Sequence, residues 1–258
     1  MRLMKRILSA AAVLALSAPL LVGCSSGTAS SVPVSASSAA ESTVSSVEET
    51  ASSAVDENEA AAAQLLNDLT GSYQELWPVI LADEYKQTWL DDCTALVGED
   101  NAEAAFEKLS SMVTGDVYGE DAVKAYANGG GAYFCGFTNS LAILTFDGET
   151  STISGTDKDG NVLFSHTYHY IGMEPVRGLY EFQSDDADSG EFTYFFLAPD
   201  TSAETYHIEF RYGSDAEALS QYDTGEYAYW LASGISTDCD QTMIDNCIEL
   251  FCTENLAG

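Results

Sequence analysis

The feature that most constrains this chain is a series of short strand-like segments that begins after Gly129. Asp147-Gly148 and Asp159-Gly160 stand between successive segments, as tight hairpin turns require. Many short antiparallel strands with close turns are typical of a sandwich or a barrel. The candidate strands are Ala132–Thr138, Leu141–Phe146, Thr150–Thr156, Val162–Ile171, Gly178–Gln183, Glu191–Leu197 and Thr205–Tyr212.

The last candidate strand alternates cleanly between two faces, because successive side chains of a strand point in opposite directions. One face carries Tyr206, Ile208, Phe210 and Tyr212, and the other carries Thr205, His207, Glu209 and Arg211.

The stretch from Glu59 to about Ala127 has a helical pattern instead. Apolar residues recur at spacings of three and four at Leu65, Leu69, Tyr73, Leu76, Trp77 and Ile80. Gly71 and Pro78 interrupt this run, so we expect two short helices there. Further helices are expected at Ala102–Met112, at Asp121–Ala127 and, closing the chain, at about Thr237–Phe251. The sequence predicts a mainly β fold with N-terminal helices and a C-terminal helix.

The N-terminus has the organisation of an export signal. Met1–Arg6 is positively charged, and an apolar run follows from Ile7 to Val22. The run ends in Leu21-Val22-Gly23-Cys24, which resembles the lipobox of bacterial lipoproteins. We therefore expect residues 1–23 to be removed and Cys24 to carry acyl chains, two or more of which anchor a protein stably. This predicts an extracytoplasmic protein that is anchored to the cell membrane.

Residues 24–59 consist mostly of Ser, Ala, Thr, Val and Glu, with no aromatic residue and no periodicity. Such a segment cannot bury enough apolar surface to offset its ordering entropy. We expect it to be a flexible linker, followed by one folded domain over residues 60–254.

The balance of charge restricts the partners of this domain. The chain has 41 acidic and 9 basic residues, a formal charge of −32. Nucleic acid is excluded as a natural partner, because binding phosphates requires a basic surface. The negative field attracts cations instead, although such a charge also serves solubility alone.

Five cysteines follow Cys24, namely Cys93, Cys135, Cys239, Cys247 and Cys252. An odd number leaves at least one thiol free or paired between molecules. None lies in a C-x-x-C pair, so a thiolate zinc site is weakly supported. Export permits disulfides, but the sequence does not assign their partners.

Several segments, in this order, resemble the ZinT family of extracytoplasmic zinc- and cadmium-binding proteins. The resemblance covers about Leu66 to Ile248, and no single segment carries it alone. Its segments are Leu66-Asn67-Asp68-Leu69-Thr70-Gly71-Ser72-Tyr73-Gln74-Glu75-Leu76-Trp77-Pro78, Tyr168-His169-Tyr170-Ile171-Gly172, Ala198-Pro199, Thr205-Tyr206-His207-Ile208, Gly213-Ser214-Asp215 and Tyr227-Ala228-Tyr229.

The resemblance implies a calycin- or lipocalin-like antiparallel β-barrel and a zinc site of three histidines. At the family's ligand positions this chain has Phe195, Thr205 and His207. Phe cannot coordinate a cation and Thr does so weakly, so two of the three ligands are lost.

Other side chains are candidates to complete a site around His207, which we expect to face the barrel lumen. Glu209 lies on the same strand face, two residues along. His166 and His169 are three residues apart, so they should point to opposite faces and at most one can join His207. His207, Glu209 and one of these histidines would form an open three-ligand site for zinc or a similar divalent cation. Alternatively, His207, Glu209 and Arg211 simply form a polar lumen or a solvated face with a salt bridge.

Three functions remain open. The first is metal binding, in zinc scavenging or buffering near the membrane, with a metal-uptake transporter as a possible partner. The second is a metal-free lipocalin-like module whose cavity holds a small organic ligand. The third is a cell-surface interaction protein. We expect no enzyme, because the chain lacks G-x-S-x-G, H-E-x-x-H and G-x-x-x-x-G-K motifs.

Overall fold

The computed structural model describes residues 57–198 and 207–257. The predicted signal peptide at 1–23, Cys24 and Thr205 lie outside the described residues, as does the linker as far as residue 56. Residues 57–59, which the sequence assigned to the linker, already belong to a helix over residues 57–68.

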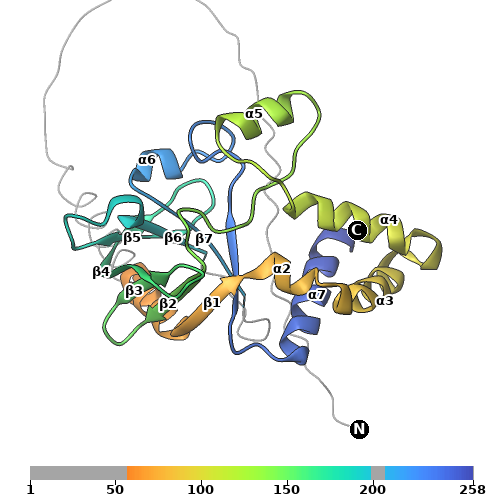
Figure 1. The fold of residues 1–258 in the computed structure, drawn as a ribbon, viewed down its shortest axis with the longest axis horizontal. Helices are drawn as coiled ribbons and strands as arrows, with labels where there is room; N and C mark the ends of the chain where they lie inside the picture. The colour runs from red at the N-terminus through yellow and green to blue at the C-terminus, as the bar shows by residue number, and fades with distance from the viewer. Residues whose placement is uncertain (1–56, 199–206, 258) are drawn as a thin grey trace, which may run out of the picture. The chain divides into compact units, whose positions relative to one another are not determined.

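The core of the fold is a closed barrel of antiparallel strands that pair in chain order, from β1 to β8 (Figure 1). β1 closes the barrel by pairing with β2 on one side and with β8 on the other; Tyr73 lies opposite Leu144 and Ser236. The predicted lipocalin-like barrel is confirmed. The strands are β1 (Gly71–Glu75), β2 (Ile143–Asp147), β3 (Thr152–Thr156), β4 (Val162–Met173), β5 (Tyr180–Ser184), β6 (Tyr194–Leu197), β7 (His207–Gly213) and β8 (Ala232–Ser236).

The helices gather mostly in the N-terminal part and at the C-terminal end, as predicted. Figure 1 shows α3, α4 and α7 grouped together beside the barrel. Asp240 caps α7, because its side chain accepts a hydrogen bond from the Met243 backbone N–H at 3.0 Å. The helices are α2 (Leu76–Ile80), α3 (Lys86–Val97), α4 (Glu99–Val113), α5 (Glu120–Ala127), α6 (Ala216–Leu219) and α7 (Gln241–Leu256), with 3-10 turns at Asp83–Tyr85 and Gly190–Phe192.

Two segments differ from the sequence prediction. Gly71–Glu75, which the apolar spacing placed in a helical stretch, is strand β1, and its neighbours in the barrel are distant in sequence. Ala132–Thr138, predicted as a strand, forms only isolated bridges, in which Phe134 pairs with Thr114 and Trp230. Its C-terminal end reaches the lumen core instead, where Phe137 packs against Phe210 with ring centroids 5.3 Å apart.

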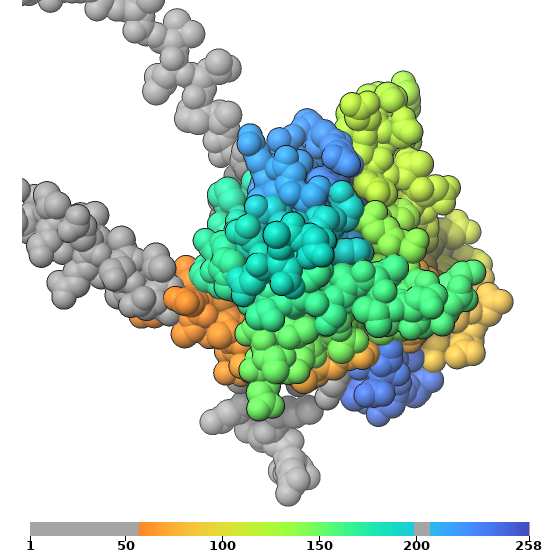
Figure 2. All heavy atoms as spheres, turned by 60° about the vertical axis from the view of Figure 1, so that its left-hand side comes forward, coloured from red at the N-terminus to blue at the C-terminus, as the bar shows by residue number. Residues whose placement is uncertain are grey.

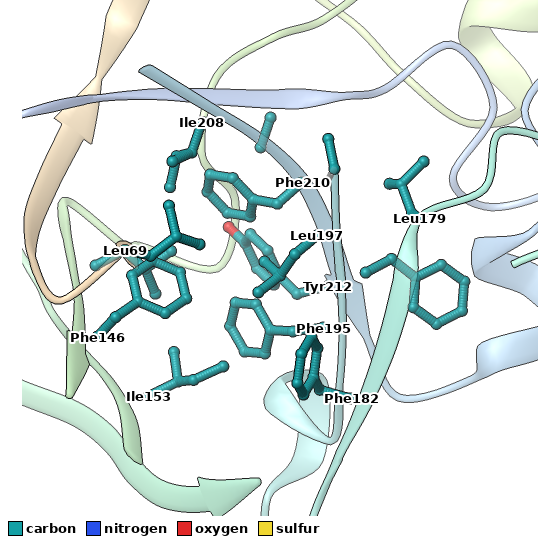
Figure 3. Packing of buried hydrophobic residues seen from close by; sticks show 14 of the residues in the cluster. Leu69, Phe146, Ile153, Leu179, Phe182, Phe195, Leu197, Ile208, Phe210 and Tyr212 are labelled. Atoms are coloured by element: carbon teal, nitrogen blue, oxygen red, sulfur yellow. The ribbon is translucent and has the colours of Figure 1, made fainter. Parts of the chain in front are cut away.

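Two apolar cores follow from this architecture. The first fills the barrel lumen, where Phe146, Phe182, Phe195, Phe210 and Tyr212 pack against one another (Figure 3). The second lies between the outside of the barrel and the α2, α3, α4 and α7 helices, and includes Trp77, Trp89, Ile235, Cys247 and Ile248.

The surface in Figure 2 is formed largely by the segments from β4 to β6, drawn in green to cyan. Over residues 57–198 and 207–257, no helix has both the length and the apolar character needed to cross a bilayer.

Candidate functional site

Strand β7 is covered on both faces, and this decides where His207 and Glu209 lie. Ile208, Phe210 and Tyr212 belong to the core of the lumen, as the alternation predicts. His207 is paired with Ile235 of β8, which belongs to the core under the helices. Directly opposed residues of an antiparallel pair share a face. His207 and Glu209 therefore face the helices, and the expectation that His207 lies in the lumen is wrong.

These two side chains line a small pocket between the barrel and α7. Its volume is about 70 Å³. Potential metal donors around it are the imidazole of His207, the carboxylates of Glu209 and Glu254, and the thiol of Cys247. Trp77 and three other apolar residues, Leu76, Leu250 and Phe251, complete the wall. The wall of the pocket thus combines two carboxylates with apolar side chains.

The electrostatics of this region disfavour thiolate ligands. Burial raises the pKa of Cys247 to about 12, and the negative charges of Glu209 and Glu254 act in the same direction. Burial, followed by the charge of Glu209, likewise raises the pKa of Cys135 to about 12. A cation that bound either sulfur would have to displace the thiol proton, so the raised pKa weakens these thiols as ligands. The imidazole and the carboxylates are the stronger donors of the pocket.

His166 and His169 lie elsewhere, on β4. His166 stacks on Phe164 with ring centroids 5.9 Å apart, and its Nδ1 is 2.7 Å from Asp186 Oδ2. His169 Nδ1 is 2.6 Å from Asp185 Oδ1, on an exposed side chain. The burial pattern of β4 alternates between these positions, so the two histidines point to opposite faces, as predicted.

The predicted three-ligand site is not assembled. Within the described part of the chain, no group of three or more His, Cys, Asp or Glu side chains is arranged to hold a metal ion. Of the four predicted ligands, His207 and Glu209 line one pocket, because β7 turns them toward α7, whereas His166 and His169 are engaged by Asp186 and Asp185.

Of the family's lost ligand positions, Phe195 is separated in space from His207. Phe195 is fully buried in the lumen, with its ring 5.4 Å from the rings of Tyr168 and Tyr212. It therefore packs on the opposite side of the sheet from His207. Thr205 lies outside the described residues.

A larger pocket, which the sequence did not indicate, also lies outside the lumen. It has a volume of about 330 Å³ and is lined by Glu75, Trp77, Pro78, Leu81, Val113, Thr114, Gly115, Phe134, Cys135 and Gly136. The pocket was missed because the sequence pattern placed Glu75 and Trp77 in a helical stretch. The aromatic and acidic residues of Tyr73–Pro78 were the sequence signal that could have indicated it.

The class of the protein follows from this geometry: a closed eight-stranded, lipocalin-like barrel with its pockets between the sheet and an outer helical layer. No family model and no curated protein sequence matches the chain.

Solved structures that are similar to it include two zinc-bound ones. The zinc-bound ZinT-like domain of AdcA from Streptococcus pneumoniae is 15% identical with a TM-score of 0.45, and the match covers 71% of this chain and 89% of that one. Zinc-bound AdcA from the same organism is 14% identical with a TM-score of 0.42, and the match covers 75% of this chain and 35% of that one.

Proposed function

We propose that the chain is a lipid-anchored extracytoplasmic protein that binds a divalent cation at His207 and Glu209. The observation that carries this proposal is their common pocket, to which α7 adds Glu254. Imidazole and carboxylate donors suit zinc among the divalent cations. The strongly acidic composition supports the proposal, because it raises the local concentration of cations around the domain.

Weak binding is expected from this arrangement. A catalytic-type zinc site has three protein ligands and an open position, whereas the described residues present no group of three donors in ligating positions. Two protein donors and bound water would hold the cation, so we expect a Kd of about 10–100 μM, corresponding to roughly −7 to −5.5 kcal/mol. Buffering at an exchangeable site fits this affinity better than tight scavenging.

Calorimetry with zinc on the purified chain tests the proposal. His207→Ala and Glu209→Gln should each weaken binding at least about tenfold, the loss expected when one of two donors is removed. His169→Ala is the matched control, because it removes an imidazole that faces Asp185 on another strand. Absence of zinc binding at 100 μM protein and metal, or equal binding by His207→Ala and His169→Ala, would contradict the proposal.

The larger pocket favours a second candidate function, the binding of a small organic molecule. A volume of about 330 Å³ lies at the lower end of known ligand pockets. Its wall is mostly apolar, and Glu75 adds one carboxylate, whose Oε1 accepts a hydrogen bond from the Phe137 backbone N–H at 2.6 Å. These features suit a small apolar molecule with a hydrogen-bond donor or a positive charge.

Native mass spectrometry of the purified chain tests this candidate. A bound organic molecule should be released by Val113→Trp, which fills the pocket from the end of α4. Leu96→Trp, at an exposed position of α3, is the control. Recovery of only unliganded protein from cells would count against this function.

A further inference from the structure

Two buried cysteines from separate helices touch each other in the outer helical layer. Cys93 lies on α3 and Cys252 on α7, and their Sγ atoms are 4.0 Å apart. Both residues are 0% exposed. They are 159 positions apart in the sequence, so only the packing of α7 on α3 brings them together.

Aromatic side chains pack around the pair. Trp89 of α3 lies near the ring of Phe251, with centroids 6.0 Å apart, and near that of Phe106, with centroids 5.7 Å apart. Trp89 is itself fixed, because its Nε1–H donates a hydrogen bond to the Ile80 carbonyl at 2.7 Å. This packing holds α3 against α7 over the two sulfur atoms.

We propose that Cys93 and Cys252 form a disulfide when the chain folds outside the cytoplasm. The two sulfurs are in van der Waals contact, and rotation of the side chains toward each other must bring them from 4.0 Å to the bond length of about 2.05 Å. The oxidant is a disulfide of a thiol oxidoreductase or of a small thiol, R–S–S–R. One cysteine loses its proton, and its thiolate attacks R–S–S–R to form a mixed disulfide and R–S⁻. The thiolate of the second cysteine then attacks the mixed disulfide, forms the protein disulfide and displaces the other R–S⁻, and each R–S⁻ takes up one of the released protons. Two thiols and one disulfide thus give one protein disulfide and two R–S–H.

The exchange has to precede the final packing of α7. Burial raises the pKa of both thiols in the folded state, and for Cys252 the neighbouring Cys93 raises it further. Only the thiolate attacks a disulfide, and neither sulfur is exposed to an oxidant once the helices have packed. The pair therefore reacts while the chain is still partly open.

The other cysteines are placed for different contacts. Cys135 directs its sulfur toward the Tyr133 carbonyl at 3.9 Å. Cys247 lines the pocket with His207, on the side of α7 that faces the barrel. Cys239 is half-buried in the segment before α7. The disulfide therefore connects α7 to α3 without using the side of α7 that covers β7.

A thiol count on the purified chain tests this inference, which rests on the proposed export for its oxidant. With cells lysed in denaturant and a maleimide, three of the five cysteines after Cys24 should react, and all five after reduction. Peptide mapping should identify a Cys93–Cys252 linkage. Cys93→Ser should leave four reactive thiols and Cys135→Ser only two. Reduction should lower the melting temperature by about 5–15 °C, as expected for the release of a long closed loop.

A refolding arm separates the geometry from the export. The reduced chain is refolded in a mixture of oxidised and reduced glutathione, which needs no cell compartment. Five reactive thiols, or a linkage between other cysteines, would overturn the proposed pair. A Cys93–Cys252 disulfide after refolding, with five reactive thiols at harvest, would overturn its formation in the cell. Neither result depends on whether His207 and Glu209 bind a cation.

Discussion

The guanidinium carbon of Arg211 lies 4.3 Å from the centroid of the Tyr222 ring, and the Arg211 side chain is fully buried. Its nitrogens donate hydrogen bonds to the carbonyls of Leu219, Gln221 and Tyr227. Arg211 therefore fixes the segment after α6 to strand β7. Arg211 is therefore not part of a solvated face with His207 and Glu209, which the sequence left open as an alternative.

Arg211→Met should destabilise the domain strongly. It leaves buried carbonyls without donors, at a cost of roughly 1–3 kcal/mol for each unsatisfied group, so we expect the free energy of unfolding to fall by about 3 kcal/mol or more. Urea unfolding at pH 7 measures this loss of free energy. Arg177→Met is the control, because Arg177 lies 4.4 Å from the same Tyr222 ring but is exposed. Its loss should cost about 1 kcal/mol or less, and equal losses would contradict the role of Arg211.

Gly115 is a position where only glycine fits. A Cβ at this residue would lie 2.3 Å from the Ala132 carbonyl oxygen and 2.9 Å from that of Tyr133. The clash is with backbone atoms. The Gly115 N–H holds the same backbone in place, because it donates a hydrogen bond to the Tyr133 carbonyl at 3.1 Å. Gly115→Ala should therefore cost about 1–3 kcal/mol or more, measured as a lower melting temperature.

The matched control is Gly172→Ala, on β4. A Cβ there would meet nothing within 4 Å. Alanine also reduces the freedom of the unfolded chain, so we expect no loss and a gain of up to about 0.5 kcal/mol. An unchanged melting temperature for Gly115→Ala would show that the backbone at Ala132 and Tyr133 yields easily, and would contradict the prediction.

The parts of the fold that depend on local sequence could be predicted. Strands β2, β3 and β4 were found because their alternation and the Asp147-Gly148 and Asp159-Gly160 turns are neighbouring features of the chain. Helices α4 and α5 were found because each keeps an apolar stripe.

Barrel closure could not be predicted in the same way. β1 has five residues between two helices, and it becomes a strand because it pairs with β2 and β8, which are remote in sequence. The Ala232–Ser236 segment is β8 for the same reason, and its predominantly buried, non-alternating pattern gives no period of two.

The site was predicted only in part, because both faces of β7 are buried. Alternation correctly grouped His207 with Glu209 and separated them from Phe210. It could not show which group lies inside the barrel, since the opposite side is covered by α7 rather than by water. His166 could not be excluded either, because its pairing with Asp186 depends on the β4–β5 hairpin.

Three hydrogen bonds join the Tyr212 hydroxyl to Thr138. The Tyr212 hydroxyl accepts hydrogen bonds from the Thr138 N–H at 2.6 Å and the Thr138 Oγ1 at 3.0 Å, and donates to the Thr138 carbonyl at 2.9 Å. Tyr212→Phe removes all three, so we expect a loss of about 2–3 kcal/mol in urea unfolding. Thr138→Val removes one and should cost about 1 kcal/mol. The reverse order of losses would contradict this arrangement.

Asp92 should make the stability of the α3–α7 contact depend on pH. Burial raises the pKa of Asp92, and the charges of Glu249, Asp245 and Asp91 raise it further. A carboxyl whose pKa is higher in the folded state binds its proton more tightly there, so its favourable contribution is present at low pH and is lost as the pH rises through the folded pKa. At pH 7 the ionised Asp92 is therefore destabilising.

Asp92→Asn should raise the melting temperature at pH 7. The gain should shrink as the pH falls through the raised pKa of the folded state, and it should be lost once the pH is below about 4, the ordinary range of an aspartate. Asp157→Asn is the control of opposite sign. Hydrogen bonds from the side chain and backbone of Asn161 lower the pKa of Asp157, so its ionised form is stabilising and its loss should lower the melting temperature at pH 7. Melting curves of both variants at pH 7 and pH 3.5 check the pair. A gain for Asp92→Asn that stays constant with pH would show that it arises from packing and not from ionisation.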